Sequence, residues 1–166
     1  MSKSSVYLET SFLSALVDMR EHPISRAQRQ QSLEWWEKQR SDYELFCSQA
    51  VVYELSRESF PGQEHVLALT EKLRLLPITP EVEGVVEVYR KNLVMPAGGI
   101  GDATHLAIAS VYSIDYLLTW NCKHLANANK IKHIEAINRR IGLVTPFMLT
   151  PPMLLKEIDD AATEEI

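Results

Sequence analysis

The chain of 166 residues is 46% hydrophobic, which is enough for one sizeable core and gives no sign of a second domain. Its formal net charge of −5 argues against a polyanionic partner, but five of the 22 acidic residues lie in the last ten positions. The preceding 156 residues carry 17 basic and 17 acidic side chains, so charge alone does not exclude nucleic acid. We expect one folded domain over residues 1–155 and an acidic, mobile tail over residues 156–166.

Short β-favouring apolar runs alternate with stretches of helical periodicity along the chain. In chain order, we expect a strand at 6–8, helices at 10–16 and 23–40, a strand at 43–48, helices at 51–59 and 64–76, a strand at 76–78, helices at 80–94 and 102–111, a strand at 115–120, a helix at 128–141, a strand at 144–149 and a helical turn at 151–158. This alternation predicts an α/β fold with a central, mostly parallel β-sheet flanked by α-helices in three layers. Any site is then expected outside the carboxyl ends of the strands.

Several local signals refine this prediction. Thr10 or Ser11 is expected to cap the first helix, and Gly142 to end the helix at 128–141. Leu33 and Trp36 are expected to pin the long polar helix to the body of the domain. The first apolar run is too short and too soon interrupted for a signal peptide or a membrane span, and two cysteines are too few for a disulfide framework, so we expect a cytoplasmic protein.

Four oxygen-bearing side chains occupy positions that can meet at one edge of such a sheet. Glu9 and Asn121 each follow an expected strand, Glu54 lies shortly after another, and Asp102 opens a helix. Each has a purely structural alternative: a helix cap for Glu9 and Asp102, an ion pair with Arg57 for Glu54, and a turn for Asn121. If they do converge, three carboxylates need a cation, and hard oxygen ligands favour Mg²⁺ or Mn²⁺. Such a site would suit metal-assisted hydrolysis of a phosphodiester.

Zinc is a weaker interpretation of the same region. His105, His124 and Cys122 offer zinc-ligand atoms, but their spacing is not that of a structural zinc site. We expect His105 to pack beside Asp102 on the pocket side, and His124 with Lys123 to contact phosphate.

Four segments, VYLETSFLSAL, VVYELSRES, GDATHLAIAS and DYLLTWNCKHLAN, occur in this order. Together they resemble the four signature motifs of the PIN domain, the fold of VapC-type toxins, and the first is similar to a subgroup with a Y-x-E-T-S motif. The resemblance extends from about residue 6 to about residue 152. It implies an endoribonuclease that depends on Mg²⁺ or Mn²⁺, is restrained by a cognate antitoxin protein, and forms a homodimer.

Carried over position by position, the resemblance assigns the catalytic roles to Glu9, Glu54, Asp102 and Asn121, with the three acids as metal ligands. It implies that Thr119 orients Asn121 by hydrogen bonding. The secondary candidates are Thr10, Thr119, His105, Lys123 and His124. Two positions depart from the common pattern, because Glu9 is one methylene longer than the usual Asp and Asn121 replaces an acid. The loss of a charge at Asn121 is expected to weaken cation binding or favour a single metal ion.

Two segments are locally basic and could steer RNA toward the site. Their basic residues are Arg20, Arg26, Arg29, Lys38 and Arg40, and Lys123, Lys130, Lys132, Arg139 and Arg140. Solvated helix faces explain the same pattern without a ligand. The departures at Glu9 and Asn121 keep a second class open, a PIN-fold module that binds RNA or protein with little catalysis. A structure-specific DNase on the same fold is a third possibility.

Overall fold

The centre of the molecule is a five-stranded sheet whose strands all run parallel, in the order β3-β2-β1-β4-β5. The computed structural model describes residues 2–96 and 100–156. The strands are β1 (Ser5–Leu8), β2 (Glu44–Ser48), β3 (Arg74–Leu76), β4 (Tyr116–Leu118) and β5 (Phe147–Leu149). The predicted parallel α/β sheet is therefore confirmed, with the first strand of the chain in the middle.

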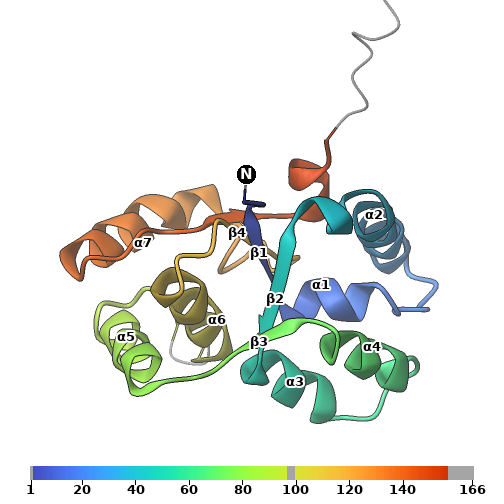
Figure 1. The fold of residues 1–166 in the computed structure, drawn as a ribbon, viewed down its shortest axis with the longest axis horizontal. Coiled ribbons are helices and arrows are strands. Elements are labelled where there is room, and N and C mark those ends of the chain that lie inside the picture. Colours follow the sequence, from blue (N-terminus) through green and yellow to red (C-terminus); the bar gives the residue numbers. More distant parts are fainter. Residues whose placement is uncertain (1, 97–99, 157–166) are drawn as a thin grey trace, which may run out of the picture.

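Helices cover both faces of this sheet. They are α1 (Thr10–Ala15), α2 (Pro23–Gln39), α3 (Gln49–Ser56), α4 (Gln63–Thr70), α5 (Pro80–Lys91), α6 (Ile100–Val111) and α7 (Ala128–Arg140), with 3₁₀ turns η1 (Arg40–Asp42) and η2 (Pro151–Leu154). Figure 1 shows α1, α2 and α4 on one side of the strands and α5, α6 and α7 on the other. This is the three-layer arrangement expected of parallel strands joined by helical crossovers.

The two middle strands are buried on both faces, as their apolar sequences require. Val6, Tyr7 and Leu8 of β1 have no exposed surface, and neither have Leu117 and Leu118 of β4. Covering both faces of a parallel sheet explains why these strands are apolar runs without alternation. The site is therefore built on a rigid centre.

The contact between α2 and the body confirms one prediction and adds a residue to it. Leu33 and Trp36 are partly buried and pack against the core, and Trp35, with no exposed surface, is the most buried residue of this contact. The Trp35 ring meets Phe12 edge-on at 5.6 Å between centroids and stacks on Tyr43 at 5.8 Å. The indole at position 35 packs in the core because this part of the helix faces α1 and the start of β2.

Some boundaries also differ from the prediction. Strand β3 covers Arg74–Leu76 rather than 76–78, because Pro77 lacks the N–H group that a longer ladder needs. The preceding helix accordingly stops at Thr70. Strand β5 is shorter than predicted, and the last turn is a 3₁₀ turn ending at Leu154. The predicted end of α7 is confirmed by Gly142, which follows with a φ of 76°. The predicted tail at 156–166 lies outside the described residues from residue 157 onward.

Gly62 fixes the approach of the α3–α4 connection to α1. Its φ is 87°, and a Cβ atom there would lie 2.7 Å from Val17 Cβ, so both the backbone conformation and the close approach require glycine. The neighbouring Phe60 and Pro61 are thereby held against the end of α1. In the described part of the chain no helix is long and apolar enough to cross a membrane.

Candidate active site

The order of the strands creates a switch point between β1 and β4, the usual location of a ligand site in an open parallel sheet. Glu9 follows β1 directly, and Thr119 follows β4 directly. The two strand ends are joined where the Glu9 backbone N–H donates to the Leu118 carbonyl at 3.1 Å. The side chains of Glu9 and Thr119 consequently lie close together at the carboxyl ends of β1 and β4.

Glu9 is a buried carboxylate, with 4% of its surface exposed, and is held at one oxygen by three donors. Oε2 accepts hydrogen bonds from the Ser11 backbone N–H at 3.0 Å, the Ser11 hydroxyl and the Thr119 hydroxyl at 2.8 Å. The bond to the backbone also makes Glu9 the N-cap of α1, in place of the predicted Thr10 or Ser11. Because Oε2 is saturated by donors, Oε1 is the oxygen that faces the interior of the site.

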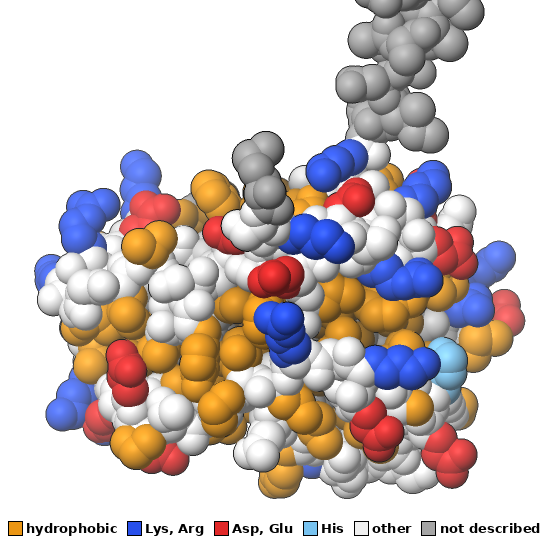
Figure 2. Space-filling model, viewed as in Figure 1, with side chains coloured by type: hydrophobic (Ala, Val, Ile, Leu, Met, Phe, Trp, Pro, Cys, Tyr) orange, Lys and Arg blue, Asp and Glu red, His pale blue; other side chains and the backbone are white. Residues whose placement is uncertain are grey.

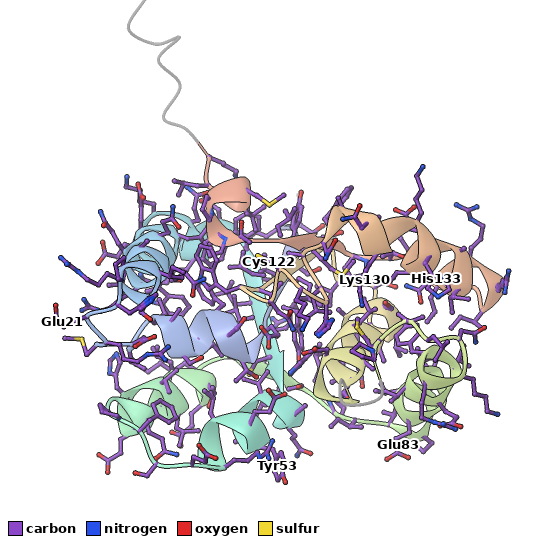
Figure 3. All side chains as sticks on the ribbon, turned by 180° about the vertical axis from the view of Figure 1, so that it is seen from behind. Glu21, Tyr53, Glu83, Cys122, Lys130 and His133 are labelled. Atoms are coloured by element: carbon purple, nitrogen blue, oxygen red, sulfur yellow. The ribbon has the colours of Figure 1, made fainter. Side chains whose placement is uncertain are left out.

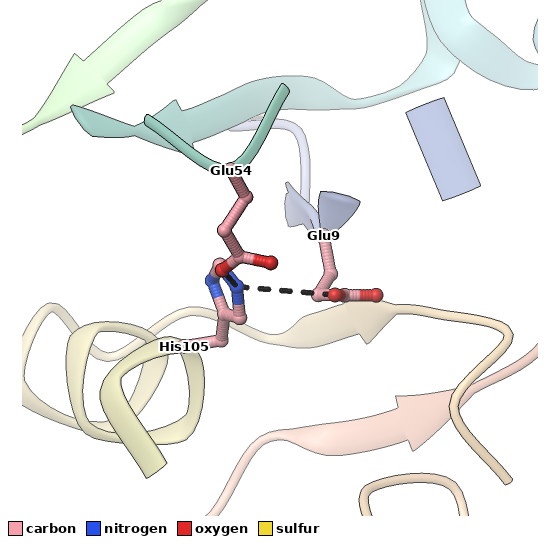
Figure 4. Close-up of side chains that lie close together, drawn as sticks. All are labelled: Glu9, Glu54 and His105. Carbon is pink, nitrogen blue, oxygen red and sulfur yellow. Dashed lines mark hydrogen bonds and ion pairs between the residues drawn. The ribbon is translucent and has the colours of Figure 1, made fainter. Parts of the chain in front are cut away.

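Glu9, Glu54 and His105 form a cluster in which one ligand atom from each lies within 4.8 Å of the others. His105 Nε2 is 2.5 Å from Glu54 Oε1 and 3.8 Å from Glu9 Oε1 (Figure 4). The three residues come from the end of β1, the last turn of α3 and the middle of α6. Gly101 of α6 lies beside Glu54, since a Cβ atom there would be in ordinary contact with Oε1 at 3.4 Å.

The protonation of this cluster follows from its charges. Burial acts to raise the pKa of Glu54, but the hydrogen bond and positive charge of His105 outweigh it and lower the pKa below its ordinary value. Burial acts to lower the pKa of His105, but the bond to Glu54 and the charges of Glu9, Glu54 and Asp102 raise it. Both shifts reflect the contact between the His105 ring and the Glu54 carboxylate, which favours the charged form of each group.

A buried chain of hydroxyl groups fixes the orientation of the imidazole. His105 Nδ1 and the Tyr7 hydroxyl are 2.7 Å apart, and the same hydroxyl is 2.7 Å from Ser48 Oγ. All three side chains are buried. Tyr7 lies on β1 two residues before Glu9, and Ser48 caps α3, the helix that carries Glu54. These hydrogen bonds therefore connect the His105 imidazole to the two elements that position Glu9 and Glu54.

A cleft of about 820 Å³ opens beside Glu9. Its walls include Ser11 and Trp120, Asn121 after β4, and Phe60 and Pro61 from the α3–α4 connection. A neighbouring hollow of about 420 Å³ shares Arg20 with the cleft and is also lined by Arg26 and Arg29. These arginines belong to the first basic segment, and Figure 2 shows Lys and Arg side chains gathered over α2.

Not all of the predicted site residues join the cluster. Asp102 is half-buried in the first turn of α6 and acts on His105 through its charge, but it lies outside the group of three ligands. Asn121 lines the cleft, while its side-chain oxygen accepts a hydrogen bond from the His124 backbone N–H at 3.0 Å. Its backbone N–H donates to Thr119 Oγ1 at 2.9 Å, so Thr119 contacts both Glu9 and Asn121.

The secondary candidates are divided between the cluster and the surface. Thr10 interacts with Glu54 and lowers its pKa, and the buried Thr10 hydroxyl makes no hydrogen bond of regular geometry with any other described residue. Lys123 is exposed and His124 half-buried, with His124 Nδ1 3.5 Å from Lys130 Nζ. Figure 3 shows Lys130 on α7 and the neighbouring Cys122 in the connection that follows β4. Cys122 is exposed and lies outside the ligand cluster, and Cys47 is buried, both as free thiols.

Sequence reasoning misses three supporting residues. Tyr7, Ser11 and Ser48 are not predicted as part of the site, although Tyr7 and Ser11 lie two residues to either side of Glu9. His105 is predicted to lie beside Asp102 on the pocket side; the charge of Asp102 does act on the ring, which in addition lies between Glu9 and Glu54. The signal was present, because residues three apart on a helix share a face and Asp102 was already a candidate.

The fold and the site define a parallel α/β domain with two converging carboxylates at the switch point of its sheet. The PIN domain family model matches residues 6–130. The chain belongs to the PIN domain family. A comparison with curated proteins gives no match.

Three solved structures share this fold at low sequence identity. The Mycobacterium tuberculosis toxin VapC20, described as cleaving the sarcin-ricin loop, has a TM-score of 0.55 at 19% identity, over 72% of this chain and 92% of its own. VapBC2 from Rickettsia felis, bound to a promoter DNA fragment, has a TM-score of 0.55 at 14% identity, and the match covers 87% of this chain and 97% of its own. A toxin–antitoxin complex from Klebsiella pneumoniae has a TM-score of 0.55 at 14% identity, and the match covers 89% of this chain and 98% of its own.

Proposed function

We propose that this protein is a divalent-metal-dependent endoribonuclease and the toxin of a toxin–antitoxin pair. The observation that carries the proposal is the convergence of Glu9 and Glu54, from separate elements, at the switch point of the sheet beside an open cleft. Two carboxylates this close repel each other unless a positive charge lies between them. In a nuclease, two such carboxylates bind a metal ion, which activates a water molecule and neutralises charge on the phosphodiester.

The residues present fit a cation. Glu9 presents Oε1 to the cluster because its other oxygen is occupied by Ser11 and Thr119. The buried Thr10 hydroxyl, which makes no hydrogen bond of regular geometry with any other described residue, is a further oxygen beside Glu54. Glu9, Glu54 and Asp102 would hold Mg²⁺ or Mn²⁺, directly or through water, and Asn121 would complete the site.

The surroundings of the cluster suit a polyanion. Arg20 connects the cleft to the hollow lined by Arg26 and Arg29. In this proposal the arginines hold the RNA backbone, Lys123 and His124, which follow Asn121 in the chain, make further phosphate contacts, and the carboxylates face the scissile bond.

The fold relatives support the biological setting. Two of the three similar structures are toxin–antitoxin assemblies and the third is a toxin that cleaves RNA. We therefore propose a cognate antitoxin as the partner in the cytoplasm and a homodimer as the assembly, with apolar helix surface around residues 66–76 as one candidate for its interface.

One observation favours a second function, that of a PIN-fold module with little catalysis. A protonated His105 would place one positive charge between the Glu9 and Glu54 carboxylates, and the net charge of the cluster would then be −1 instead of −2 without a metal ion. If that ion pair is permanent, the cleft would bind RNA or a protein segment without cutting it. This alternative predicts no Mn²⁺ binding at millimolar concentrations in calorimetry.

The test is cleavage of total cellular RNA by the purified protein with Mn²⁺, with Mg²⁺ and with chelator. We expect discrete fragments that require metal and disappear in Asp102→Asn. Asp42→Asn is the matched control, because Asp42 is an exposed acid in η1, remote from the cluster. Metal-independent cleavage, or cleavage that survives in Asp102→Asn, would refute the proposal.

A further inference from the structure

His105 lies between Glu9 and Glu54, the two carboxylates proposed above to hold a metal ion, and it is the nitrogen donor of this cluster. Two ligands that each lie about 2.1 Å from one ion are at most about 4.2 Å apart. The 3.8 Å between His105 Nε2 and Glu9 Oε1, and the 2.5 Å between Nε2 and Glu54 Oε1, both fall inside that limit. The ligand atoms of all three residues lie within 4.8 Å of one another, so small side-chain movements would bring them to one ion.

The second ring nitrogen of His105, Nδ1, is hydrogen-bonded to a fixed partner, as is usual in metal-binding histidines. A ligating histidine donates its second ring N–H to a fixed acceptor, which sets its tautomer and orientation. Here Nδ1 lies 2.7 Å from the Tyr7 hydroxyl, which in turn lies 2.7 Å from Ser48 Oγ. With Nδ1–H donating to Tyr7, Nε2 carries the lone pair on the side of Glu9 and Glu54.

We propose that His105 Nε2 is a ligand of the metal ion together with Glu9 and Glu54, and that this nitrogen donor makes the site select Mn²⁺ over Mg²⁺. The inference rests on the proposed metal-dependent function and makes its cofactor specific. Mg²⁺ is bound in proteins through oxygen and water, whereas imidazole favours transition metals. When the ion binds, it takes the place of the proton on Nε2, which is released to solvent.

The first test needs no substitution. The metal-free protein is loaded with one equivalent of Mn²⁺ and studied by pulsed EPR, once with natural histidine and once with ¹⁵N-labelled histidine. We expect a nitrogen coupling from a single imidazole that changes with the label. Mn²⁺ binding without this coupling would overturn the assignment of His105 while leaving the proposed nuclease intact.

The second test measures metal selectivity by calorimetry. His105→Gln replaces nitrogen with an oxygen donor of similar reach, and we expect it to lose the coupling and to lower the preference for Mn²⁺ over Mg²⁺ by about tenfold or more. Tyr7→Phe keeps the ring but removes its acceptor, and is expected to weaken Mn²⁺ binding by roughly ten- to a hundredfold. His65→Gln, at an exposed position on α4, is the control and should change neither quantity.

The remaining outcomes separate the two proposals. An unchanged Mn²⁺ to Mg²⁺ ratio in a folded His105→Gln would refute the selectivity, even if RNA is still cut. Failure of the wild-type protein to bind either ion would refute the ligand assignment. The cleavage assay with chelator then decides the proposed function separately, because RNA cutting can be followed whether or not nitrogen contacts the ion.

Discussion

The hydroxyl of Thr119 joins the two strand ends on which the site is built, and replacing it tests this arrangement. Thr119→Val keeps the shape of the side chain but removes a donor to Glu9 Oε2 at 2.8 Å and an acceptor for the Asn121 N–H at 2.9 Å. A hydrogen bond to a charged group contributes about 1.5–3 kcal/mol, and an unsatisfied buried donor costs about 1–3 kcal/mol. Asn121 is half-buried, so water compensates part of the second loss.

We therefore expect Thr119→Val to lower the free energy of unfolding by about 2–4 kcal/mol, which corresponds to a fall in Tm of roughly 5–15 °C for a domain of this size. Urea unfolding in the presence of chelator measures this without a contribution from metal. Thr70→Val is the matched control, because Thr70 is equally buried but makes one neutral bond, to the Leu67 carbonyl. It should lose only about 1 kcal/mol, and equal losses in the two variants would refute a special role for the contact with Glu9.

Two further predictions use the titrating groups. The pKa of His105 is higher in the folded than in the unfolded protein, so His105 adds stability that is complete below its unfolded pKa of 6.5 and is lost as the pH rises through its folded pKa. The pKa of Glu54 is lower in the folded protein, so Glu54 adds stability that is present above its unfolded pKa of 4.5 and is lost as the pH falls through its folded pKa. Urea midpoints of the chelated protein should therefore be highest between these unfolded values, and a His105→Gln variant that keeps the alkaline decline would contradict this. Burial raises the pKa of Cys47 to about 11, so in the folded protein a thiol reagent should modify only the exposed Cys122, and modification of two thiols before unfolding would be the contrary result.

Periodicity was sufficient to predict the layers of the fold. The apolar runs of β1 and β4 and the spacing of α6 place these elements correctly, because burial on two faces leaves an unambiguous pattern. Periodicity was insufficient to predict which of two adjacent residues, Trp35 or Trp36, is fully buried. Adjacent residues on a helix differ by only about 100°, so only the partners Phe12 and Tyr43 decide which indole is buried.

The candidate site shows a similar division. The convergence of Glu9 and Glu54 was predictable, since both follow strands of one parallel sheet. The helix-capping alternative for Glu9 was also correct, because one oxygen caps α1 while the other faces the cluster. Spacing from Asp102 puts His105 on the pocket side, but its contact with Glu54 could not be predicted, because that contact depends on how α6 packs against α3.

The cluster and the far wall of the cleft come from different parts of the chain. Glu9 and His105 are rooted in the sheet and in α6, whereas Phe60 and Pro61 belong to a surface connection held by one glycine. The connection between α1 and α2 supplies Arg20 in the same way. Separate parts of the chain therefore form the cluster and the wall of the cleft, so changes in these two connections would alter the shape of the cleft without replacing any residue of the cluster.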